Sequence, residues 1–308
     1  MISASGRTYA SAVALLLAAV AACSPTAQPV ATPEAAATST PEPTPPPTPR
    51  TTIRFVAVGD IGQGNDVQRR VGARIVELHR QRPIDVLLLL GDIIYPDGAG
   101  HRYEERFAEP WRPVLDAKIA MAAALGNHDV QTDGGRDVMD LFEMPERYYE
   151  VDVGPATFYA LDTNRFDAEQ RRWLRDALAE DSAGWKIPFM HAPPYSSGMH
   201  GSTGSVRDGL DPILDEFDVP LTLAAHDHNY ERTHPVDGTT HVVAGTACCL
   251  RPVERSDFTA VAFSEPGVVV GDLDGELLIL RFVHADGRVL DEVELTLAAA
   301  AVGADARG

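Results

Sequence analysis

Five short, largely apolar runs, each ending abruptly in polar residues, constrain the fold of this chain more than any other feature. The runs cover residues 53–58, 84–90, 119–125, 187–190 and 219–225. Continuous apolar segments of this length are typical of strands that are buried on both faces. Because each run stops at a glycine or a histidine, the sequence predicts buried strands that deliver polar side chains at their carboxyl ends.

Helical patterns lie between some of these strands. Residues 67–79 place Val71 and Ile75 on one face, and residues 168–178 repeat the pattern with Leu174. Further short strands are expected at 147–153, 156–161, 239–244, 265–272, 276–284 and 288–297. Alternating strands and helices predict an α/β fold of two packed sheets flanked by helices, with ligands at the carboxyl ends of the strands.

The composition favours a globular protein with an acidic surface. The 308 residues are 44% hydrophobic, which is enough to form a sizeable core. The formal net charge is −19, and because the two arginines and two glutamates of residues 1–50 cancel, this charge lies entirely in residues 51–308. Such a surface repels polyanions, so the sequence argues against nucleic acid as a partner.

The first 22 residues have the layout of a bacterial export signal. Arg7 precedes an apolar stretch from Ala10 to Ala22 that is too short to span a membrane and ends in small residues. Residues 20–23 also resemble a lipobox, in which Cys23 is lipidated and becomes the N-terminus. The alternatives are a simple secretory signal and an uncut anchor. We expect an exported cell-envelope lipoprotein on the extracytoplasmic face, in contact with a membrane through Cys23.

The segment that follows is expected to be an extended tether. Nine prolines and many threonines occur between Ser24 and Pro49, with almost no large apolar residues. A segment of this composition cannot bury enough surface to fold. The sequence therefore predicts a signal peptide at 1–22, a tether at 23–52, one folded domain at 53–298 and a disordered tail at 299–308.

Two further cysteines, Cys248 and Cys249, are adjacent in the sequence. Neighbouring Cα atoms lie about 3.8 Å apart, below the usual disulfide range of roughly 4.4 to 6.8 Å. We therefore expect two free or buried thiols, and a domain that depends on the size of its core instead of on disulfides.

The strand ends supply eight residues of the kinds that bind metals or transfer protons. A single aspartate or histidine in such a place is usually a helix cap, a turn former or a surface residue. Their joint occurrence at successive strand ends favours one shared site instead. The set is Asp60, Asp92, Tyr95, Asn127, His128, His191, His226 and His228.

In their order along the chain, these strand-end segments resemble the five motifs of the metallophosphoesterases, the calcineurin-like superfamily. The segments are Gly59-Asp60-Ile61-Gly62, Gly91-Asp92-Ile93-Ile94-Tyr95, Gly126-Asn127-His128-Asp129, Met190-His191 and His226-Asp227-His228. Tyr95 and the Tyr230-Glu231-Arg232 continuation are similar to the purple acid phosphatase branch, which includes the tartrate-resistant acid phosphatases. The resemblance covers residues 53–250 and implies a four-layer α/β/β/α sandwich of two mixed sheets flanked by helices.

The resemblance also implies two metal ions with different ligand sets. The first ion, Fe(III), would have a carboxylate, a phenolate and an imidazole as ligands, namely Asp60, Tyr95 and His228. The second ion, Fe(II), Zn or Mn, would have an amide and two imidazoles, namely Asn127, His191 and His226. Asp92 would bridge the two ions. A hard anionic ligand set suits trivalent iron, whereas the amide and imidazoles suit a divalent ion.

The implied reaction is the hydrolysis of a phosphate ester. A metal-bound hydroxide would attack phosphorus in line, the ions and His128 would stabilise the equatorial oxygens, and an acid would protonate the departing alcohol. His200 is a candidate for that acid, because it follows His191 by nine residues in the polar loop 195–205 and plant-type relatives carry histidine at a similar separation. An exposed loop histidine is an equally good interpretation.

Four residues outside the motifs have weaker support. Asp162 follows an apolar run and either orients a ligand or forms a strand-end turn. His101, His234 and His241 match no motif, and we expect them to be structural or surface residues.

The chain departs from the family pattern in two places. Ala225 stands where the last motif usually has a glycine, which adds a methyl group at a tight turn. Cys248 and Cys249 fall where relatives often have a glycine-rich loop near the pocket, so their side chains could narrow access for the substrate or respond to oxidation.

Together these features predict an exported, lipid-anchored dinuclear phosphomonoesterase of the acid phosphatase type, acting on small phosphate esters. One alternative is a phosphodiesterase of the same superfamily, but related diesterases generally lack the tyrosine ligand that Tyr95 would provide. The other alternative is a metal-binding surface lipoprotein without catalysis, against which the complete ligand set argues. The sequence does not fix the natural substrate, the second metal or the oligomeric state.

Overall fold

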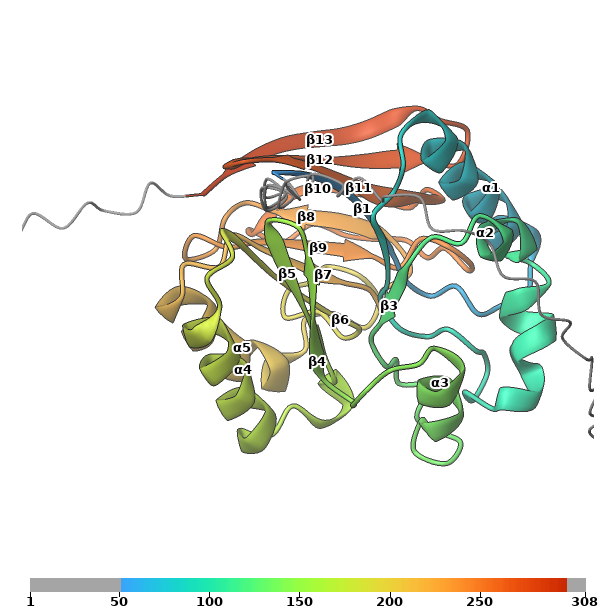
Figure 1. The fold of residues 1–308 in the computed structure, drawn as a ribbon, viewed down its shortest axis with the longest axis horizontal. Helices are drawn as coiled ribbons and strands as arrows, with labels where there is room; N and C mark the ends of the chain where they lie inside the picture. Colours follow the sequence, from blue (N-terminus) through green and yellow to red (C-terminus); the bar gives the residue numbers. More distant parts are fainter. Residues whose placement is uncertain (1–50, 298–308) are drawn as a thin grey trace, which may run out of the picture. The chain divides into compact units, whose positions relative to one another are not determined.

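The computed structural model describes residues 51–297, which form two sheets with helices on both outer sides (Figure 1). The predicted signal peptide, the lipidation site at Cys23, nearly all of the predicted tether and the predicted tail lie outside the described residues. Among the described residues no helix is both long and apolar enough to span a bilayer.

The elements follow one another along the chain in an alternating order. The first sheet contains β1 (Thr52–Val58), β2 (Val86–Leu89), β3 (Met121–Ala123), β11 (Gly267–Asp274), β12 (Leu277–His284) and β13 (Val289–Thr296). The second contains β4 (Tyr149–Val153), β5 (Ala156–Leu161), β6 (Trp185–Met190), β7 (Leu221–Ala224), β8 (Tyr230–Thr233), β9 (Thr240–Ala244) and β10 (Thr259–Phe263). The α-helices are α1 (Asp66–Gln81), α2 (Arg112–Asp116), α3 (Arg136–Leu141), α4 (Ala168–Glu180) and α5 (Gly204–Glu216). Three short 3-10 or π segments cover Gly100–Arg102, Glu104–Ala108 and Thr163–Arg165.

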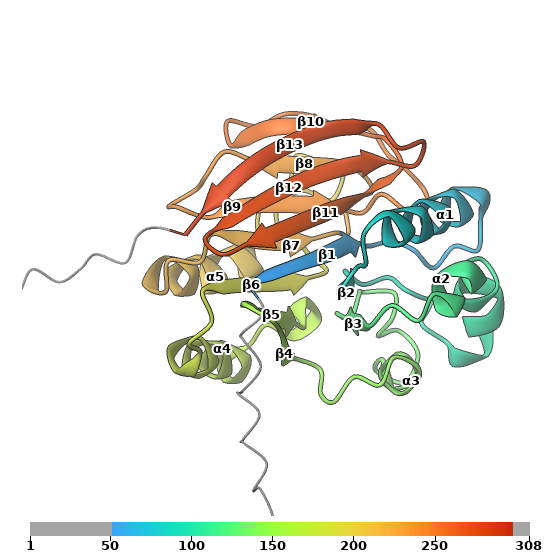
Figure 2. The ribbon, with the colours of Figure 1, turned by 45° about the horizontal axis from the view of Figure 1, so that its top comes forward.

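Both sheets are mixed: the parallel strands form one side of the six-stranded sheet and the centre of the seven-stranded sheet. The six-stranded sheet has the order β13-β12-β11-β1-β2-β3, and the seven-stranded sheet has the order β10-β8-β9-β7-β6-β5-β4. Strands β1, β2 and β3 are parallel to one another, and so are β5, β6, β7 and β9. Figure 2 shows β1 lying between β11 and β2, with the helices at the sides of the sheets.

The main core lies between the two sheets. Phe55 and Ala57 of β1 belong to it, together with Phe158 of β5 and Phe189 of β6. The rings of Phe55 and Phe158 meet edge to face with centroids 5.3 Å apart. Because successive side chains of a strand point to opposite faces, the alternate residue Val56 faces outward. Each sheet therefore has one face inside the sandwich and the other face covered by helices.

The two outer cores are built by amphipathic helices. Val71 and Ile75 of α1 pack on the outer face of the six-stranded sheet, and Leu174 of α4 and Leu210 of α5 do so on the seven-stranded sheet. Asn65 caps α1 by accepting a hydrogen bond from the backbone N–H of Gln68. These layers confirm the predicted four-layer α/β/β/α sandwich of two mixed sheets flanked by helices.

The sequence predicts most of the strands but misses several elements. Strands β2 and β3 are shorter than the apolar runs that predict them, and β8, β10, α2, α3 and α5 were not predicted. Helix α5 contains Gly204, Gly209 and Pro212, residues that usually argue against a helix. It forms because Val206, Leu210 and their neighbours bury an apolar face, which outweighs local propensity.

Candidate metal centre

Three of the predicted ligands have left-handed backbone conformations directly after buried strands. Their φ angles are 56° at Asp60, 54° at Asp92 and 71° at His226. Such a conformation costs a non-glycine residue about 1 to 3 kcal/mol and is found most often at functional sites. The surrounding fold holds it through hydrogen bonds, for example from the N–H of Asp60 to the carbonyl of Gly91 at 3.0 Å. The sharp turn after each strand aims the side chain toward the region between the strand ends.

Glycines in the motifs allow the loops to approach one another closely. A Cβ atom at Gly126 would lie 2.1 Å from Oδ1 of Asp92, and one at Gly91 would lie 2.7 Å from Nδ1 of His191. No side chain larger than hydrogen fits at either position without a shift of these residues. The two glycines therefore bring the carboxylate of Asp92 and the imidazole of His191 into one cluster.

The first predicted ligand set forms a compact group. The hydroxyl of Tyr95 donates a hydrogen bond to Oδ1 of Asp60 at 2.8 Å and lies 3.3 Å from Nε2 of His228. Nε2 of His228 lies 3.2 Å from Oδ1 of Asp60. Donor atoms separated by about 3 Å are at the spacing expected for ligands that share one ion with bonds of roughly 2.0 to 2.2 Å.

The second predicted set forms a similar group beside it. Nε2 of His191 lies 3.0 Å from Oδ1 of Asn127 and 3.2 Å from Nδ1 of His226. The ring centroids of the two histidines are 5.0 Å apart. The amide oxygen of Asn127 and Nδ1 of His226 therefore both lie within 3.2 Å of Nε2 of His191.

Asp92 lies between the two groups. Its Oδ1 atom is 3.5 Å from Nε2 of His191, and ligand atoms of Asp60, Asp92 and His191 all lie within 4.8 Å of one another. Oδ1 of Asp92 also accepts a hydrogen bond from the backbone N–H of His128 at 2.9 Å. The structure thus brings the seven predicted ligands into one region, with Asp92 near both groups, and their assignment to two ions stays a prediction.

Hydrogen bonds behind the ligands orient two of the imidazoles. Nδ1 of His191 lies 2.8 Å from the carbonyl of Leu90, and Nδ1 of His228 lies 2.9 Å from the carbonyl of Cys249. Since a carbonyl can only accept, each Nδ1 carries a proton and each Nε2 is the nitrogen that faces the centre. A second partner of this kind is typical of metal-binding histidines.

The carboxylates and imidazoles of the centre shift one another's pKa values. Burial alone would raise the pKa of Asp92, but His191 and the N–H of His128 hold it well below its usual value. Burial alone would lower the pKa of His191, but Asp92 raises it to about 10. The pKa of Asp60 is likewise lowered by His228 and His191 in spite of complete burial. Both carboxylates are therefore ionised, and the buried centre favours bound cations.

The same charges also shift the pKa values of Tyr95 and His226. Burial and the neighbouring carboxylates of Asp60 and Asp92 raise the pKa of the Tyr95 hydroxyl far above its usual value. Burial and the positive charge of His191 lower the pKa of His226 to about 4. His226 is therefore a neutral imidazole over the physiological pH range, as a metal ligand must be.

A cavity of about 330 Å³ opens onto this centre. Both histidines with predicted catalytic roles line it. The ring of His128 lies 4.7 Å from that of Tyr95, and its Nδ1 bonds to the carbonyl of Pro96. The ring of His200 stacks on that of His226, with centroids 4.4 Å apart. The placement of both rings agrees with contact to a substrate, and the acid role of His200 stays a prediction.

Two buried aspartates without a predicted role, Asp129 and Asp227, position the loops of the centre. Asp129 is fully buried and accepts hydrogen bonds from the N–H groups of Ile93, Ile94 and Gly126. It thereby ties the loop after β2 to the loop after β3. Both aspartates lie inside the quoted motifs, but their partners are distant in sequence, so only the fold reveals what they do.

Asp227 ties the loop that contains His200 to the last motif. Its carboxylate accepts hydrogen bonds from the hydroxyl of Ser196 and from the N–H groups of His200 and Gly201. It is 1% exposed. The position of His200 over His226 therefore depends on a residue that lies between two predicted ligands.

Asp162 forms the strand-end turn that is one of its two predicted roles. Its carboxylate pairs with Arg147 at 2.7 Å and accepts from Asn164, whose amide donates in turn to the carbonyl of Leu125. Asp162 therefore forms a strand-end turn that supports the loop before Asn127 and does not itself reach a predicted ligand.

The three other histidines are located as expected. His101 and His234 are exposed, and His241 is buried against the hydroxyl of Thr222, with burial lowering its pKa to about 3.

The methyl group of Ala225 fits because glycine stands opposite. The Cβ of Ala225 lies only 2.3 Å from where a Cβ on Gly59 would be. The last motif has alanine in place of the usual glycine, and Gly59 of the first motif leaves the space for the alanine methyl group. This departure from the family pattern leaves the ligand His226 in place.

The expectation of two free thiols is wrong, because a disulfide joins Cys248 and Cys249. The expectation rested on the Cα separation, which is 3.8 Å as for any neighbours. It did not take into account the bend of the chain at residues 247–248, where the two Sγ atoms meet. Both sulfur atoms are therefore unavailable as thiolate ligands.

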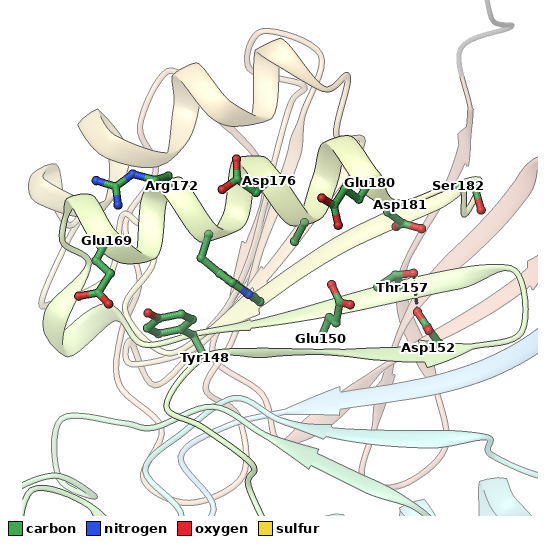
Figure 3. A pocket seen from close by; sticks show the side chains of 12 residues that line it. Tyr148, Glu150, Asp152, Thr157, Glu169, Arg172, Asp176, Glu180, Asp181 and Ser182 are labelled. Carbon is green, nitrogen blue, oxygen red and sulfur yellow. Dashed lines mark hydrogen bonds between the residues drawn. The ribbon is translucent and has the colours of Figure 1, made fainter.

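A larger cavity lies elsewhere, between α4 and the strands β4 and β5. It has a volume of about 700 Å³, and Figure 3 shows carboxylates around it. We call it the acidic groove. Its acidic residues are Glu150, Asp152, Glu169, Asp176, Glu180 and Asp181. Among residues 51–297, no histidine and no predicted site residue lines it.

Comparison with known proteins supports the assignment of the centre. Residues 53–230 match the family model described as calcineurin-like phosphoesterase. Over 274 residues the chain is 24% identical to purple acid phosphatase 17 of Arabidopsis thaliana, which covers 78% of this chain and 80% of that protein. The matched residues 53–230 contain all seven predicted ligands.

Two solved structures share the fold. A purple acid phosphatase from yellow lupin seeds superposes with a TM-score of 0.70 at 21% identity, over 80% of this chain and 54% of that one. GAP50, the anchor in the inner membrane complex of Plasmodium, superposes with a TM-score of 0.71 at 17% identity, over 81% and 90% of the two chains. At these identities the likeness shows the fold alone.

The resemblance seen in the motifs is thereby confirmed, as is the predicted enzyme class, a hydrolase of phosphoric ester bonds. A site for two metal ions is supported by the purple acid phosphatase relatives and by the cluster of Asp60, Asp92 and His191. The chain belongs to the calcineurin-like phosphoesterase family.

Proposed function

We propose that this protein is a phosphomonoesterase of the purple acid phosphatase type, which releases inorganic phosphate from small phosphate esters. The observation that carries the proposal is the position of Tyr95, whose hydroxyl lies within 3.3 Å of both Asp60 and His228. A phenol in that place adds a hard anionic donor to one half of the centre. Apart from the bridging Asp92, the other half offers one amide and two imidazoles.

The assignment of metals follows from this asymmetry. The pKa of Tyr95 is raised by burial and by two carboxylates, so only a strongly polarising cation would displace the phenol proton. We therefore propose Fe(III) at Asp60, Tyr95 and His228. Fe(II), Zn or Mn is proposed at Asn127, His191 and His226, with Asp92 as the bridge. When bound, the two ions supply Lewis acidity and an activated water as the nucleophile.

The residues of the chain then divide the remaining work. The N–H of His128 fixes Oδ1 of Asp92, and the His128 ring faces the cavity where an equatorial phosphoryl oxygen would lie. The carbonyls of Leu90 and Cys249 hold His191 and His228 in the orientation that presents Nε2. His200, held over His226 by Asp227, is proposed to deliver a proton to the departing alcohol.

The cellular setting is part of the proposal. The export signal, the lipobox at Cys23 and the proline-rich segment before residue 51 support an extracytoplasmic lipoprotein. A lipoprotein of this kind would encounter phosphate esters outside the cytoplasm.

The test uses the full chain loaded with iron and zinc. We expect a visible charge-transfer band from a phenolate bound to ferric iron, and its loss in Tyr95→Phe with the fold retained. We also expect 4-nitrophenyl phosphate to be hydrolysed faster than bis(4-nitrophenyl) phosphate. A preference for the diester would replace the proposal with a phosphodiesterase, and metal binding without turnover of either ester would replace it with a binding protein.

Tyr159→Phe is a matched control for the colour. Tyr159 is also buried and also donates to a carboxylate, that of Asp181, but it lies outside the centre. We expect this variant to keep the visible band. Loss of colour in both variants would indicate a general effect on folding.

A further inference from the structure

Arg251 lines the same cavity as the metal centre, although no motif contains it. The cavity wall includes His200, His226 and His228 as well as the side chain of Arg251. Arg251 is half-buried and lines the cavity. A cation is therefore present at the mouth of a site whose substrates are anions.

The backbone of Arg251 is fixed to the centre. Its N–H donates to the carbonyl of His228 at 2.9 Å, and its carbonyl accepts from the hydroxyl of Ser264 at 2.6 Å. Two residues earlier, the carbonyl of Cys249 accepts from Nδ1 of His228. The start of the Arg251 side chain is thus held at a constant position relative to a predicted metal ligand. Preorganisation of this kind lowers the entropic cost of binding a ligand.

The guanidinium itself has only weak, neutral partners. Within residues 51–297 it donates to Sδ of Met199 and to Nε2 of His200, each at 3.4 Å. By contrast, Arg147 and Arg232 are each paired with a carboxylate at 2.7 Å or less. In a protein with a net charge of −19, a guanidinium paired only with neutral atoms keeps its capacity for an anionic ligand.

The contacts of Arg251 indicate which part of a substrate it would meet. The face of the His200 ring stacks on His226, whereas the guanidinium reaches Nε2 at the edge of that ring and hydrogen-bonds to none of the predicted metal ligands. Beside it, Met199 is 64% exposed and offers an apolar surface. A phosphoryl group held by the two ions would lie on the His226 side, and the leaving group would extend past Met199 toward Arg251.

We propose that Arg251 is a substrate-binding residue that selects esters whose leaving group carries a second anionic group, a carboxylate or a phosphate. This inference rests on the proposed phosphomonoesterase function and names the substrate class for that site. The guanidinium forms a charge-assisted hydrogen bond with the second anion, while the body of the leaving group packs on Met199.

A matched pair of substrates tests the inference with the metal-loaded full chain. Phenyl phosphate and 4-carboxyphenyl phosphate differ only in the carboxylate. The ratio measured is kcat/KM for the carboxylated ester divided by kcat/KM for phenyl phosphate, and it does not depend on the fraction of active enzyme. We expect Arg251→Gln to lower this ratio by about ten-fold or more, chiefly through KM for the carboxylated ester. Arg251→Lys keeps the charge and is expected to retain part of the preference.

Arg255→Gln provides a control in the same segment. Arg255 bonds to the carbonyls of Thr259 and Ala260 and does not line the cavity, so the ratio should stay within about two-fold of the wild-type value. Binding of two compounds that cannot be hydrolysed, benzylphosphonate and 4-(phosphonomethyl)benzoate, gives a second readout by calorimetry. The carboxylate should tighten binding in the wild-type protein and not in Arg251→Gln.

The possible outcomes separate the inference from the proposed function. An unchanged ratio in Arg251→Gln would overturn the inference and leave the phosphatase in place. An equal loss with both esters would also overturn it and would assign Arg251 to the scissile phosphate. If the wild-type protein hydrolysed neither ester, the proposed function would fail and the inference with it.

Discussion

The metal centre and the acidic groove both contain carboxylates, two in the centre and six in the groove, but they differ in burial, in neighbouring groups and in volume. In the centre, Asp60 is 0% exposed and Asp92 is 2% exposed, and histidines lie within 3.5 Å of both. In the groove, five of the six acidic side chains are exposed to solvent. Of the residues that the structure describes, Arg172 is the only basic one in the lining, and no histidine takes part. The groove also has about twice the volume of the cavity over the centre.

The difference shows why neither size nor the number of acids identifies a site. Solvated carboxylates cost little and need no counter-ion, whereas buried carboxylates must be offset by bound cations or by hydrogen bonds. The centre has, in addition, three non-glycine ligands with a left-handed backbone, which the fold must hold in place. Burial, mixed ligand types and backbone strain together distinguish the centre from the groove.

The largest expected difference between the two regions is in catalysis. Asp92→Asn keeps the shape of the bridging side chain but removes its charge, so the ions would lose a shared ligand. We expect kcat/KM for 4-nitrophenyl phosphate to fall by about 10³-fold, and metal content to fall below two ions per chain. Kinetic assay and elemental analysis measure the two effects.

The matched change in the groove is Asp176→Asn. Asp176 is exposed and lines the groove, not the cavity over the centre. The value of kcat/KM should therefore stay within about two-fold of wild type. If both variants lost activity equally, the functional contrast between the two regions would be wrong.

The next largest difference is in folding stability. Asp129 accepts three backbone N–H groups while fully buried, and an asparagine amide would turn a donor toward at least one of them. We expect Asp129→Asn to lower the free energy of unfolding by about 2 to 4 kcal/mol. Burial and the charge of Asp92 raise the pKa of Asp129 to about 6, so urea titration at pH 8 compares the asparagine with the ionised carboxylate.

Asp152→Asn is the corresponding change in the groove. Asp152 accepts one hydrogen bond, from the hydroxyl of Thr157 at 2.9 Å, and its side chain is exposed (Figure 3). Its replacement should change stability by less than about 0.5 kcal/mol. Equal destabilisation by both variants would show that burial is not what separates the regions.

Metal binding should also depend on pH at the centre. Without an ion, Asp92 holds the pKa of His191 at about 10, above the value in an unfolded chain. Protonation of His191 therefore stabilises the metal-free fold. This contribution is fully present below about pH 6.5 and is lost as the pH rises through 10. An ion at Nε2 must displace that proton. We expect the affinity for zinc to rise roughly ten-fold per pH unit between pH 6 and 8.

Calorimetry in two buffers of different ionisation enthalpy measures the protons released. At pH 7 we expect at least one proton per zinc ion at the centre. Binding without proton release would mean that zinc occupies solvated carboxylates such as those of the groove, which are already ionised.

The sequence singles out the candidate ligands because most of them follow closely after a strand, where a local pattern fixes their place. The roles of Asp129 and Asp227 could not be predicted in the same way, since their N–H donors come from loops up to 36 residues away. Arg251 was missed for a similar reason: its position depends on backbone bonds to His228 and Ser264 that leave no pattern. Helix α5 was missed because tertiary burial outweighs its glycines and proline.

The smallest expected effect comes from repulsion within the acidic groove. Partial burial and the charges of Asp152, Asp181 and Glu180 raise the pKa of Glu150. Above the usual pKa of a glutamate, the ionised Glu150 side chain therefore slightly destabilises the fold. This destabilisation disappears as the pH falls and the carboxylate is protonated. Glu150→Gln should therefore stabilise the protein at pH 7 by about 0.2 to 0.5 kcal/mol, as measured by urea titration, and by less at pH 4. In the centre the change in the free energy of unfolding should have the opposite sign, because removal of the Asp92 charge takes away the partner of His191. If Glu150→Gln instead lowered stability at pH 7, the groove carboxylates would be held by attractive contacts, and the contrast between the two regions would have to be drawn on hydrogen bonding alone.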